Sequence, residues 1–188
     1  MNLETIVRFY IQRIRPRAKA ELAWFVRQPT LRQTIRFAAL AVNSSGKRYS
    51  HQRRIKRAAI AQARSILSDA KLRMKKCSDF DSLFRLIEAS LEDVPGIGDL
   101  YIYDTSLRIG AKLGILPEKV YLHTGTRTGA RNLGLDVAKS TVRMASLPPA
   151  LRVLKPHEVE DVLCIFKDEL KTSAASLRPG LVRRSWCG

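Results

Sequence analysis

The residues of this chain best suited to bind a ligand lie in the stretch Val94-Pro95-Gly96-Ile97-Gly98. Gly96 and Gly98 have no Cβ, so the main chain there can approach a ligand closely and adopt φ values that other residues avoid. The helix expected next begins with unpaired N–H groups at the positive end of its dipole. Such a turn can bind a phosphate, and the predicted contacts are Gly96, Ile97 and Gly98. A tight turn with only a structural role is the alternative.

The segments on both sides of this stretch have helical periodicity. Apolar residues within 80–91 recur at the spacing of one helix face, and Ser78 with Asp81 is expected to form the capping box of that helix. The helix should end at or before Val94, because a proline follows that residue. A second apolar stripe predicts a helix from residue 99 up to Gly114.

Two amphipathic helices joined by Val94 to Gly98 resemble the helix-hairpin-helix superfamily, which binds DNA backbones without reading the base sequence. The resemblance covers the turn and the helices beside it. It implies that main-chain N–H groups of Gly96, Ile97 and Gly98 contact one or two phosphates. It also implies a fold in which the hairpin belongs to a small helical domain.

The base-excision DNA glycosylases of this superfamily place a lysine after the hairpin and a catalytic aspartate farther along. Leu100 and Tyr121 stand at those positions here. A carboxylate is needed there to stabilise the positive charge that builds on the sugar. We therefore predict no catalytic residue and no cofactor. A glycosylase-like enzyme remains the alternative, with Glu118 or Asp104 as its carboxylate.

Positive charge is concentrated in the first part of the chain. Residues 1–77 contain 19 of the 34 Lys and Arg residues and only three acids, which places +16 of the net +17 there. Such asymmetry indicates a polyanionic partner. DNA is the expected partner, structured RNA remains open, and a membrane surface or a transit peptide is the alternative for the Arg-rich start. No membrane span is expected, since no apolar run approaches about 18 residues.

A second contact site is predicted after the polar turn at residues 43–46. Cations here flank hydrogen-bonding side chains, and a long helix is expected from His51 to Lys76. A nucleotide-hydrolysing phosphate loop is excluded, because Ala41 and Arg48 stand where that loop needs a glycine and a hydroxyl. An exposed connector is the alternative. The predicted phosphate contacts are Lys47, Arg48, Arg53, Arg54, Lys56 and Arg57.

Glycine and threonine recur between residues 124 and 134. Gly125 and Gly129, with Arg127 and Arg131, predict a further anion-binding turn at a helix start. A connector that closes the domain is the alternative. Arg127 and Arg131 are the predicted contacts of this segment.

The expected fold is mostly α, a multi-helix protein that contains a helix-hairpin-helix motif and no strand. Residues 1–77 form a basic helical region, residues 78–171 the helix-hairpin-helix domain, and residues 172–188 a flexible tail. A helix should begin at Lys155 to Glu158, its acids facing either the basic half or water.

Sequence-tolerant DNA binding through backbone phosphates is the predicted function, and an adaptor or scaffold in a nucleic-acid complex is a further alternative. Three dispersed histidines predict no catalytic site, and nothing identifies a protein partner. Cys77, Cys164 and Cys187 have no metal-ligand spacing, so we predict free thiols, no metal, and a reducing compartment such as the cytoplasm.

Overall fold

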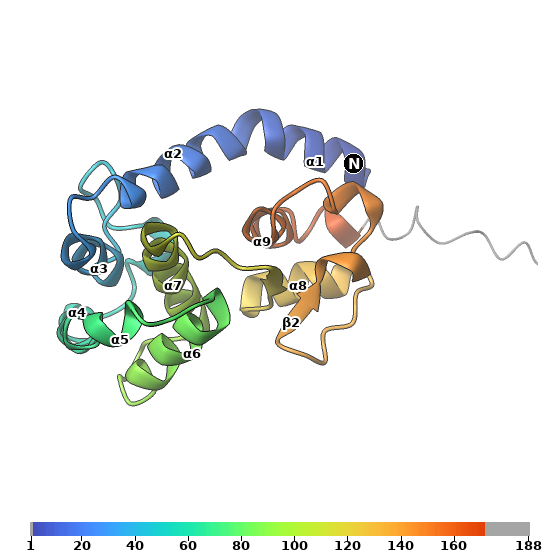
Figure 1. Cartoon of the computed structure of the whole chain (residues 1–188). Helices are drawn as coiled ribbons and strands as arrows, with labels where there is room; N and C mark the ends of the chain where they lie inside the picture. The colour runs from blue at the N-terminus through green and yellow to red at the C-terminus, as the bar shows by residue number, and fades with distance from the viewer. Residues whose placement is uncertain (1, 172–188) are drawn as a thin grey trace, which may run out of the picture.

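The computed structural model describes residues 2–171 and is mostly α, as predicted (Figure 1). The predicted tail, residues 172–188, lies outside the described residues. None of the helices within residues 2–171 combines the length and apolar character needed to cross a membrane. The helices are α1 (Leu3–Phe9), a π-helical turn (Tyr10–Ile14), α2 (Arg15–Val26), α3 (Leu31–Ala39), α4 (Arg57–Asp69), α5 (Lys71–Met74), α6 (Phe80–Leu91), α7 (Asp99–Leu113), α8 (Thr124–Asn132) and α9 (Pro156–Ile165).

Two short strands, β1 (Lys119–Tyr121) and β2 (Thr141–Arg143), form an antiparallel ribbon in which Val120 lies opposite Val142. The prediction of no strand was therefore wrong. Each strand has only three residues. This length is too short for the alternation of polar and apolar residues that identifies a strand in a sequence.

The apolar side chains form two main cores. One core lies among α2, α3, α4, α6 and α7, and the other joins α1 to α8, α9 and the ribbon. The boundary expected between residues 77 and 78 falls inside the first core, which contains side chains from both sides of it. The first core includes Phe25, Ile35, Leu67, Ile87 and Ile109. The second core includes Ile6, Tyr10, Val120, Val162 and Leu170.

Helix α7 is the central element and is packed by α2, α3 and α6. The sequence predicted one apolar stripe on it, but both of its sides are buried because helices surround it. The Tyr101 hydroxyl, for example, donates to the Ala39 carbonyl at 2.5 Å. The predicted limits are confirmed: α6 ends at Leu91, and α7 ends before Gly114, which has a φ of +78°. The expected capping box is wrong by one residue, because Asp79 and Ser82 form it.

Helices α1 and α2 form one arch across both cores (Figure 1). The π turn between them is widened where Pro16 cannot donate a backbone hydrogen bond. Tyr10 in this turn donates to Asp161 Oδ2 at 2.7 Å, and Arg15 donates to Glu158 Oε2 at 2.7 Å. The beginning of α9 at Pro156 is confirmed, and these two of its acids face the basic N-terminal half.

The helix predicted from His51 to Lys76 is present from Arg57 onward, as α4 and α5, but its predicted beginning is wrong. Residues 50–52 form a single 3-10 turn, residues 53–56 are irregular, and α4 begins only at Arg57. Tertiary hydrogen bonds outweigh helix propensity here. His51 and Gln52 each contact Asp104 Oδ2 at 2.8 Å, and Arg48 Nη2 donates to the Ile55 carbonyl at 2.8 Å.

Candidate nucleic-acid interface

The turn between α6 and α7 has the geometry of a type II turn. The Ile97 N–H donates to the Val94 carbonyl at 3.2 Å, with Pro95 and Gly96 in the central positions. Gly96 has a φ of +86°, which this turn type requires of its third residue. Glycine at position 96 is thus explained by the backbone alone.

Gly98 is different. Its φ of −125° and ψ of 176° describe extended backbone that any residue adopts, and no heavy atom lies within 4 Å of where a Cβ would stand. Gly98 is also the N-cap of α7 and gives it no side-chain cap, although Ser or Asp would stabilise the helix more. Neither packing nor backbone conformation therefore requires glycine at this position. In the first turn of α7, the Tyr101 N–H donates to the Gly98 carbonyl at 2.9 Å, and no side chain at the N-cap covers the N–H groups of Asp99 and Leu100.

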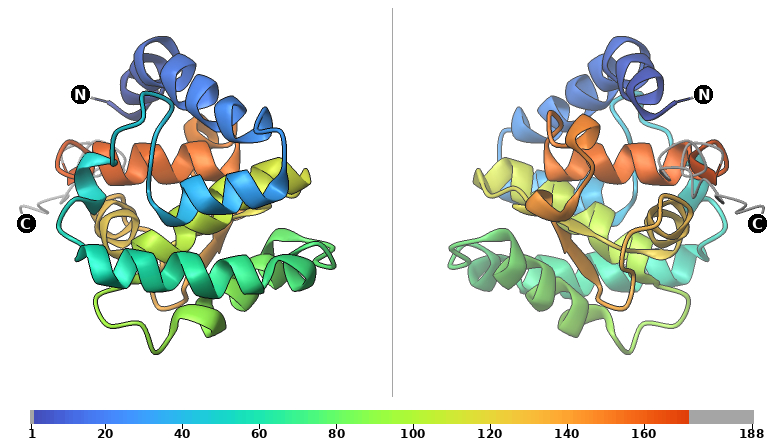
Figure 2. Two further views of the ribbon diagram at one scale, coloured as in Figure 1. Left: turned by 90° about the vertical axis from the view of Figure 1, so that its left-hand side faces the viewer. Right: turned by 90° about the vertical axis from the view of Figure 1, so that its right-hand side faces the viewer.

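Three segments that are distant in the sequence meet near this turn. In both views of Figure 2, the turn, residues 50–57 and α8 lie on the same side of the molecule. His123, the N-cap of α8, interacts electrostatically with Asp104, Asp99 and His51. Burial lowers the pKa of His123 despite the two carboxylates. The structure thus brings together two histidines that the sequence left dispersed.

Asp104 joins residues 51 and 52 to α7. It accepts from His51 and Gln52 at 2.8 Å and from Arg108 at 3.0 Å. Burial raises its pKa, but the charge of Arg108 and the contact with His51 outweigh burial and hold the pKa below its usual range. Asp104 is thus an ionised group with three partners. Glu118, the other carboxylate considered for a glycosylase-like reaction, is exposed.

The predicted cations of residues 47–57 divide into two groups. Lys47, Arg48 and Arg53 line a cleft of about 630 Å³ beneath α2, together with Arg13 and Arg17. The others are exposed, lead into the start of α4 and do not line this cleft. None of these predicted cations forms an ion pair within the part of the chain that the structure describes. The group outside the cleft is Arg54, Lys56 and Arg57; within the cleft group, Lys47 and Arg53 are also exposed.

Helix α8 uses its glycines for packing. A Cβ on Gly129 would lie 1.9 Å from the Leu163 carbonyl oxygen, and one on Gly125 would lie 2.6 Å from Cys164 Sγ. The predicted Arg127 donates to the carbonyls of residues 122, 137 and 139 and so fastens the loop before β2. Arg131 is exposed. The structure therefore assigns Arg127 and both glycines a part in the fold, whereas Arg131 faces outward.

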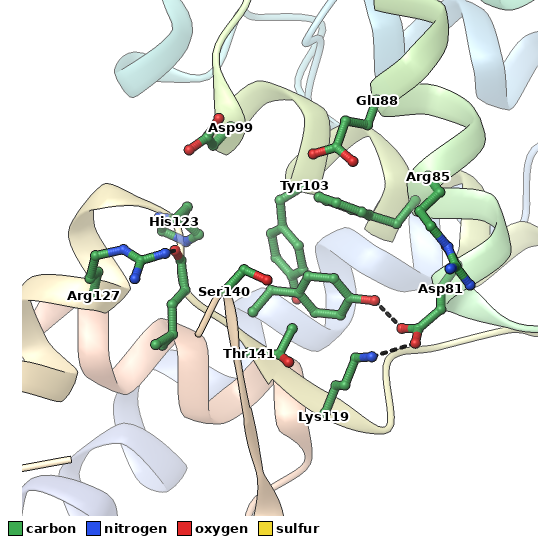
Figure 3. Close-up of a pocket in the computed structure, with 13 residues that line it drawn as sticks. Asp81, Arg85, Glu88, Asp99, Tyr103, Lys119, His123, Arg127, Ser140 and Thr141 are labelled. Atoms are coloured by element: carbon green, nitrogen blue, oxygen red, sulfur yellow. Dashed lines mark hydrogen bonds and ion pairs between the residues drawn. The ribbon is translucent and has the colours of Figure 1, made fainter. Parts of the chain in front are cut away.

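A pocket of about 360 Å³ that the sequence did not indicate lies beside Asp99 (Figure 3). On one side, Asp99 and His123 face Arg127; on the other, Lys119 and Asp81 are joined as an ion pair. Tyr121 also donates to Asp81, and although burial opposes it, these two partners lower the pKa of Asp81. About 40 residues separate Asp81 from its partners, so spacing gives no signal of the site. The pocket is further lined by Phe84, Arg85, Glu88, Tyr103, Leu122, Ser140 and Thr141.

Glu160 lies behind this pocket and is buried. One of its carboxylate oxygens accepts the Tyr121 N–H at 2.7 Å. Burial raises its pKa well above the usual range. Across residues 2–171, no group of three or more His, Cys, Asp or Glu side chains is arranged to hold a metal ion, and Cys77 and Cys164 are unpaired.

Comparison of the chain with protein-family models, with curated proteins and with solved structures finds no match. The resemblance to the helix-hairpin-helix superfamily therefore depends on the residues of the turn and its two helices.

Proposed function

We propose that this chain is a sequence-tolerant DNA-binding protein that contacts backbone phosphates. The main-chain N–H groups of Gly96 and Gly98 hold a phosphate at the start of α7, whereas the Ile97 N–H, predicted as a third contact, already donates to the Val94 carbonyl at 3.2 Å and closes the turn. Exposed cations of residues 54–57 and Arg131 supply further contacts. Gly98 is the observation that carries the proposal. Its lack of a side chain serves no internal contact, no φ requirement and no cap. It leaves the start of α7 open to an anion from outside.

The charge distribution supports the same partner. The side of the molecule that carries the turn also carries residues 50–57, where Arg53, Arg54, Lys56 and Arg57 are exposed. Asp99 disfavours phosphate binding at the turn, because this exposed carboxylate follows Gly98 directly. We therefore expect Asp99→Asn to strengthen binding about two- to fivefold at low salt, since one like charge is removed beside the phosphate.

The test is a titration of a fluorescent duplex at several salt concentrations. Affinity should fall steeply with salt, with a slope of about −0.9 for each phosphate neutralised. Gly98→Glu should weaken binding about tenfold or more, because a carboxylate would occupy the phosphate position. Ala145→Glu, an exposed position in the C-terminal part, is the charge-matched control and should change affinity less than about twofold.

Two results would contradict this proposal. One is binding that is absent or insensitive to salt. The other is an equal loss of affinity in Gly98→Glu and Ala145→Glu with unchanged thermal stability. If Gly98→Glu instead unfolds the protein, the turn has the structural role expected of an adaptor. A matched RNA duplex in the same titration separates a DNA-binding protein from one that prefers structured RNA.

A glycosylase-like activity is the second candidate, and the pocket in Figure 3 is the observation that favours it. The pocket adjoins the turn at Asp99 and contains two further carboxylates, Asp81 and Glu88. Duplexes with assorted damaged bases should then release a base, and Asp81→Asn or Glu88→Gln should abolish the release. If the unaltered protein releases no more base than a variant that carries both Asp81→Asn and Glu88→Gln, glycosylase-like activity is excluded.

A further inference from the structure

The cleft beneath α2 gathers cations from two segments that the sequence does not connect. Arg13 and Arg17 come from the helical arch, and Lys47, Arg48 and Arg53 come from the loop after α3. Among residues 2–171, none of these five side chains forms an ion pair. Cations that line one cleft without ion-pair partners favour the binding of an anion there. Arg48 Nε is buried and has no hydrogen-bond partner, which leaves a donor unused at this cleft.

Contacts from α2 hold the loop in this position. Glu21 accepts from the Ser44 N–H at 2.8 Å, from the Ser44 hydroxyl at 2.6 Å and from the Tyr49 hydroxyl at 2.6 Å. Burial raises the pKa of Glu21, but these hydrogen bonds outweigh burial and lower it. One ionised carboxylate thus fastens the basic loop to the basic helix. The loop that frames the cleft is thus held to α2, while the side chains of Arg13, Arg17, Lys47 and Arg53 along it are exposed.

A smaller pocket of about 210 Å³ adjoins the cleft. The two share Ala18, Glu21, Tyr49 and Asp161 in their linings. The inner pocket has an apolar part with polar groups around it. Together the two volumes fall within the range of about 300–1,000 Å³ that is typical of small-molecule sites. The apolar part consists of Leu22, Phe25 and Leu107, and the polar groups include Tyr10, His51 and His157.

Asp161 lies where the cleft and the inner pocket meet. One of its carboxylate oxygens accepts the Tyr10 hydroxyl at 2.7 Å. Burial raises the pKa of Asp161 to about 6. In dinucleotide-binding folds, a carboxylate near the phosphate site accepts from a ribose hydroxyl.

We propose that the cleft and the inner pocket together bind a nucleotide. The 5′-phosphates lie among Arg13, Arg17, Lys47, Arg48 and Arg53, a sugar hydroxyl donates to Asp161, and the base enters the inner pocket. The same chemistry is offered by a free nucleoside 5′-phosphate and by the 5′-phosphorylated end of a nucleic-acid strand. This site is separate from the turn at Gly96 to Gly98 and does not depend on the function proposed for it.

Calorimetry with the full chain tests this site. The probes are adenosine 5′-triphosphate, inorganic triphosphate, and one short oligonucleotide with and without a 5′-phosphate. The double variant Arg13→Gln, Arg17→Gln should lose at least about tenfold in affinity for the nucleotide or the phosphorylated strand, because two charged contacts are removed. The control is Arg32→Gln, Arg36→Gln, which removes the same charge from exposed positions on α3 and should lose less than about twofold.

The variant Leu107→Phe tests recognition of the base separately from recognition of the phosphates. A phenyl ring in the inner pocket should weaken the binding of adenosine 5′-triphosphate at least about fivefold and leave the binding of inorganic triphosphate unchanged. Binding of the free nucleotide supports a small-molecule site, and binding of only the phosphorylated strand supports an end-recognition site. The proposal is overturned if neither probe depends on Arg13 and Arg17, or if inorganic triphosphate binds as tightly as the nucleotide. Gly98→Glu should leave nucleotide affinity unchanged, so the two proposals can fail separately.

Discussion

The two glycine pairs of this chain, Gly96 with Gly98 and Gly125 with Gly129, occupy opposite kinds of surroundings. Gly96 and Gly98 precede α7, whereas Gly125 and Gly129 lie within α8, and from the sequence both pairs are interpreted as phosphate-binding turns. At α8, helix α9 occupies the space that the Cβ atoms would take, and its backbone contacts Gly129. At α7 no heavy atom lies within 4 Å of either missing Cβ. A pair of glycines near a helix is therefore compatible with close helix packing and with an open turn, and the neighbouring element distinguishes the two cases.

The largest effect that tests this comparison is expected from Gly129→Ala. Its Cβ would overlap the Leu163 carbonyl, which is backbone and cannot rotate away. We expect a loss of about 3 kcal/mol or more in the free energy of unfolding, measured by urea denaturation. Gly98→Ala should change the same quantity by less than about 0.5 kcal/mol. Similar losses at both positions would end the distinction between the two pairs.

The next largest effect is expected from the arginines of α8. Arg127→Gln removes donors to three backbone carbonyls and should destabilise the protein by about 2 kcal/mol in the same denaturation experiment. Arg131→Gln, one helical turn away and exposed, should leave stability within about 0.5 kcal/mol and reduce the salt slope of DNA binding by about one. If Arg131→Gln unfolds the protein and Arg127→Gln does not, the roles assigned to them are reversed.

Gly96→Ala sharpens the comparison within the turn itself. The φ of +86° is strained for alanine, so a loss of about 1–2 kcal/mol is expected from calorimetric unfolding. Gly98→Ala, two residues later, is the matched control without that strain. Equal stability in the two variants would show that the type II geometry of the turn is not maintained in solution.

The smallest effect concerns pH and His123 at the start of α8. Burial lowers the pKa of His123 in the folded protein, whereas the unfolded chain titrates near about 6.5. The unfolded state then binds more protons as the pH falls below that value, so stability should decrease on acidification. In His123→Gln, the loss of stability between pH 7.5 and pH 5.5 should be smaller than in the unaltered protein. An unchanged loss would mean that His123 titrates normally in the fold.

Local signals in the sequence were sufficient for α6, α7 and the turn between them. Their limits follow from apolar periodicity, from Pro95 and from Gly114, which all act within a few residues. The capping box was expected one residue too early because Ser78 and Asp79 are both suitable N-cap residues, and Asp81 forms an ion pair with Lys119 instead.

Long-range contacts account for what the sequence did not indicate. His51 and Asp104 are 53 positions apart in the sequence, so no local pattern indicates the hydrogen bond that delays the start of the expected long helix. In the same way, Arg17 and Lys47 line one cleft although they are distant in the sequence, and Glu21 binds the loop through Ser44 and Tyr49. The surroundings of the turn before α7 and the cleft beneath α2 are therefore formed by contacts between distant residues, which no local sequence pattern predicts. The cations themselves could be identified from the sequence.

The helical arch of α1 and α2 also sets the order in which the protein can fold. Ile6 and Tyr10 pack with Val162 and Leu170, so a helix at the start of the chain closes its core with residues more than 150 positions away. During synthesis, the apolar face of α1 stays exposed to solvent until α9 has been made. Such distant pairing slows folding and lengthens the period in which the nascent chain can aggregate. The first core, built from α2 to α7, can form earlier, because its members follow one another along the chain.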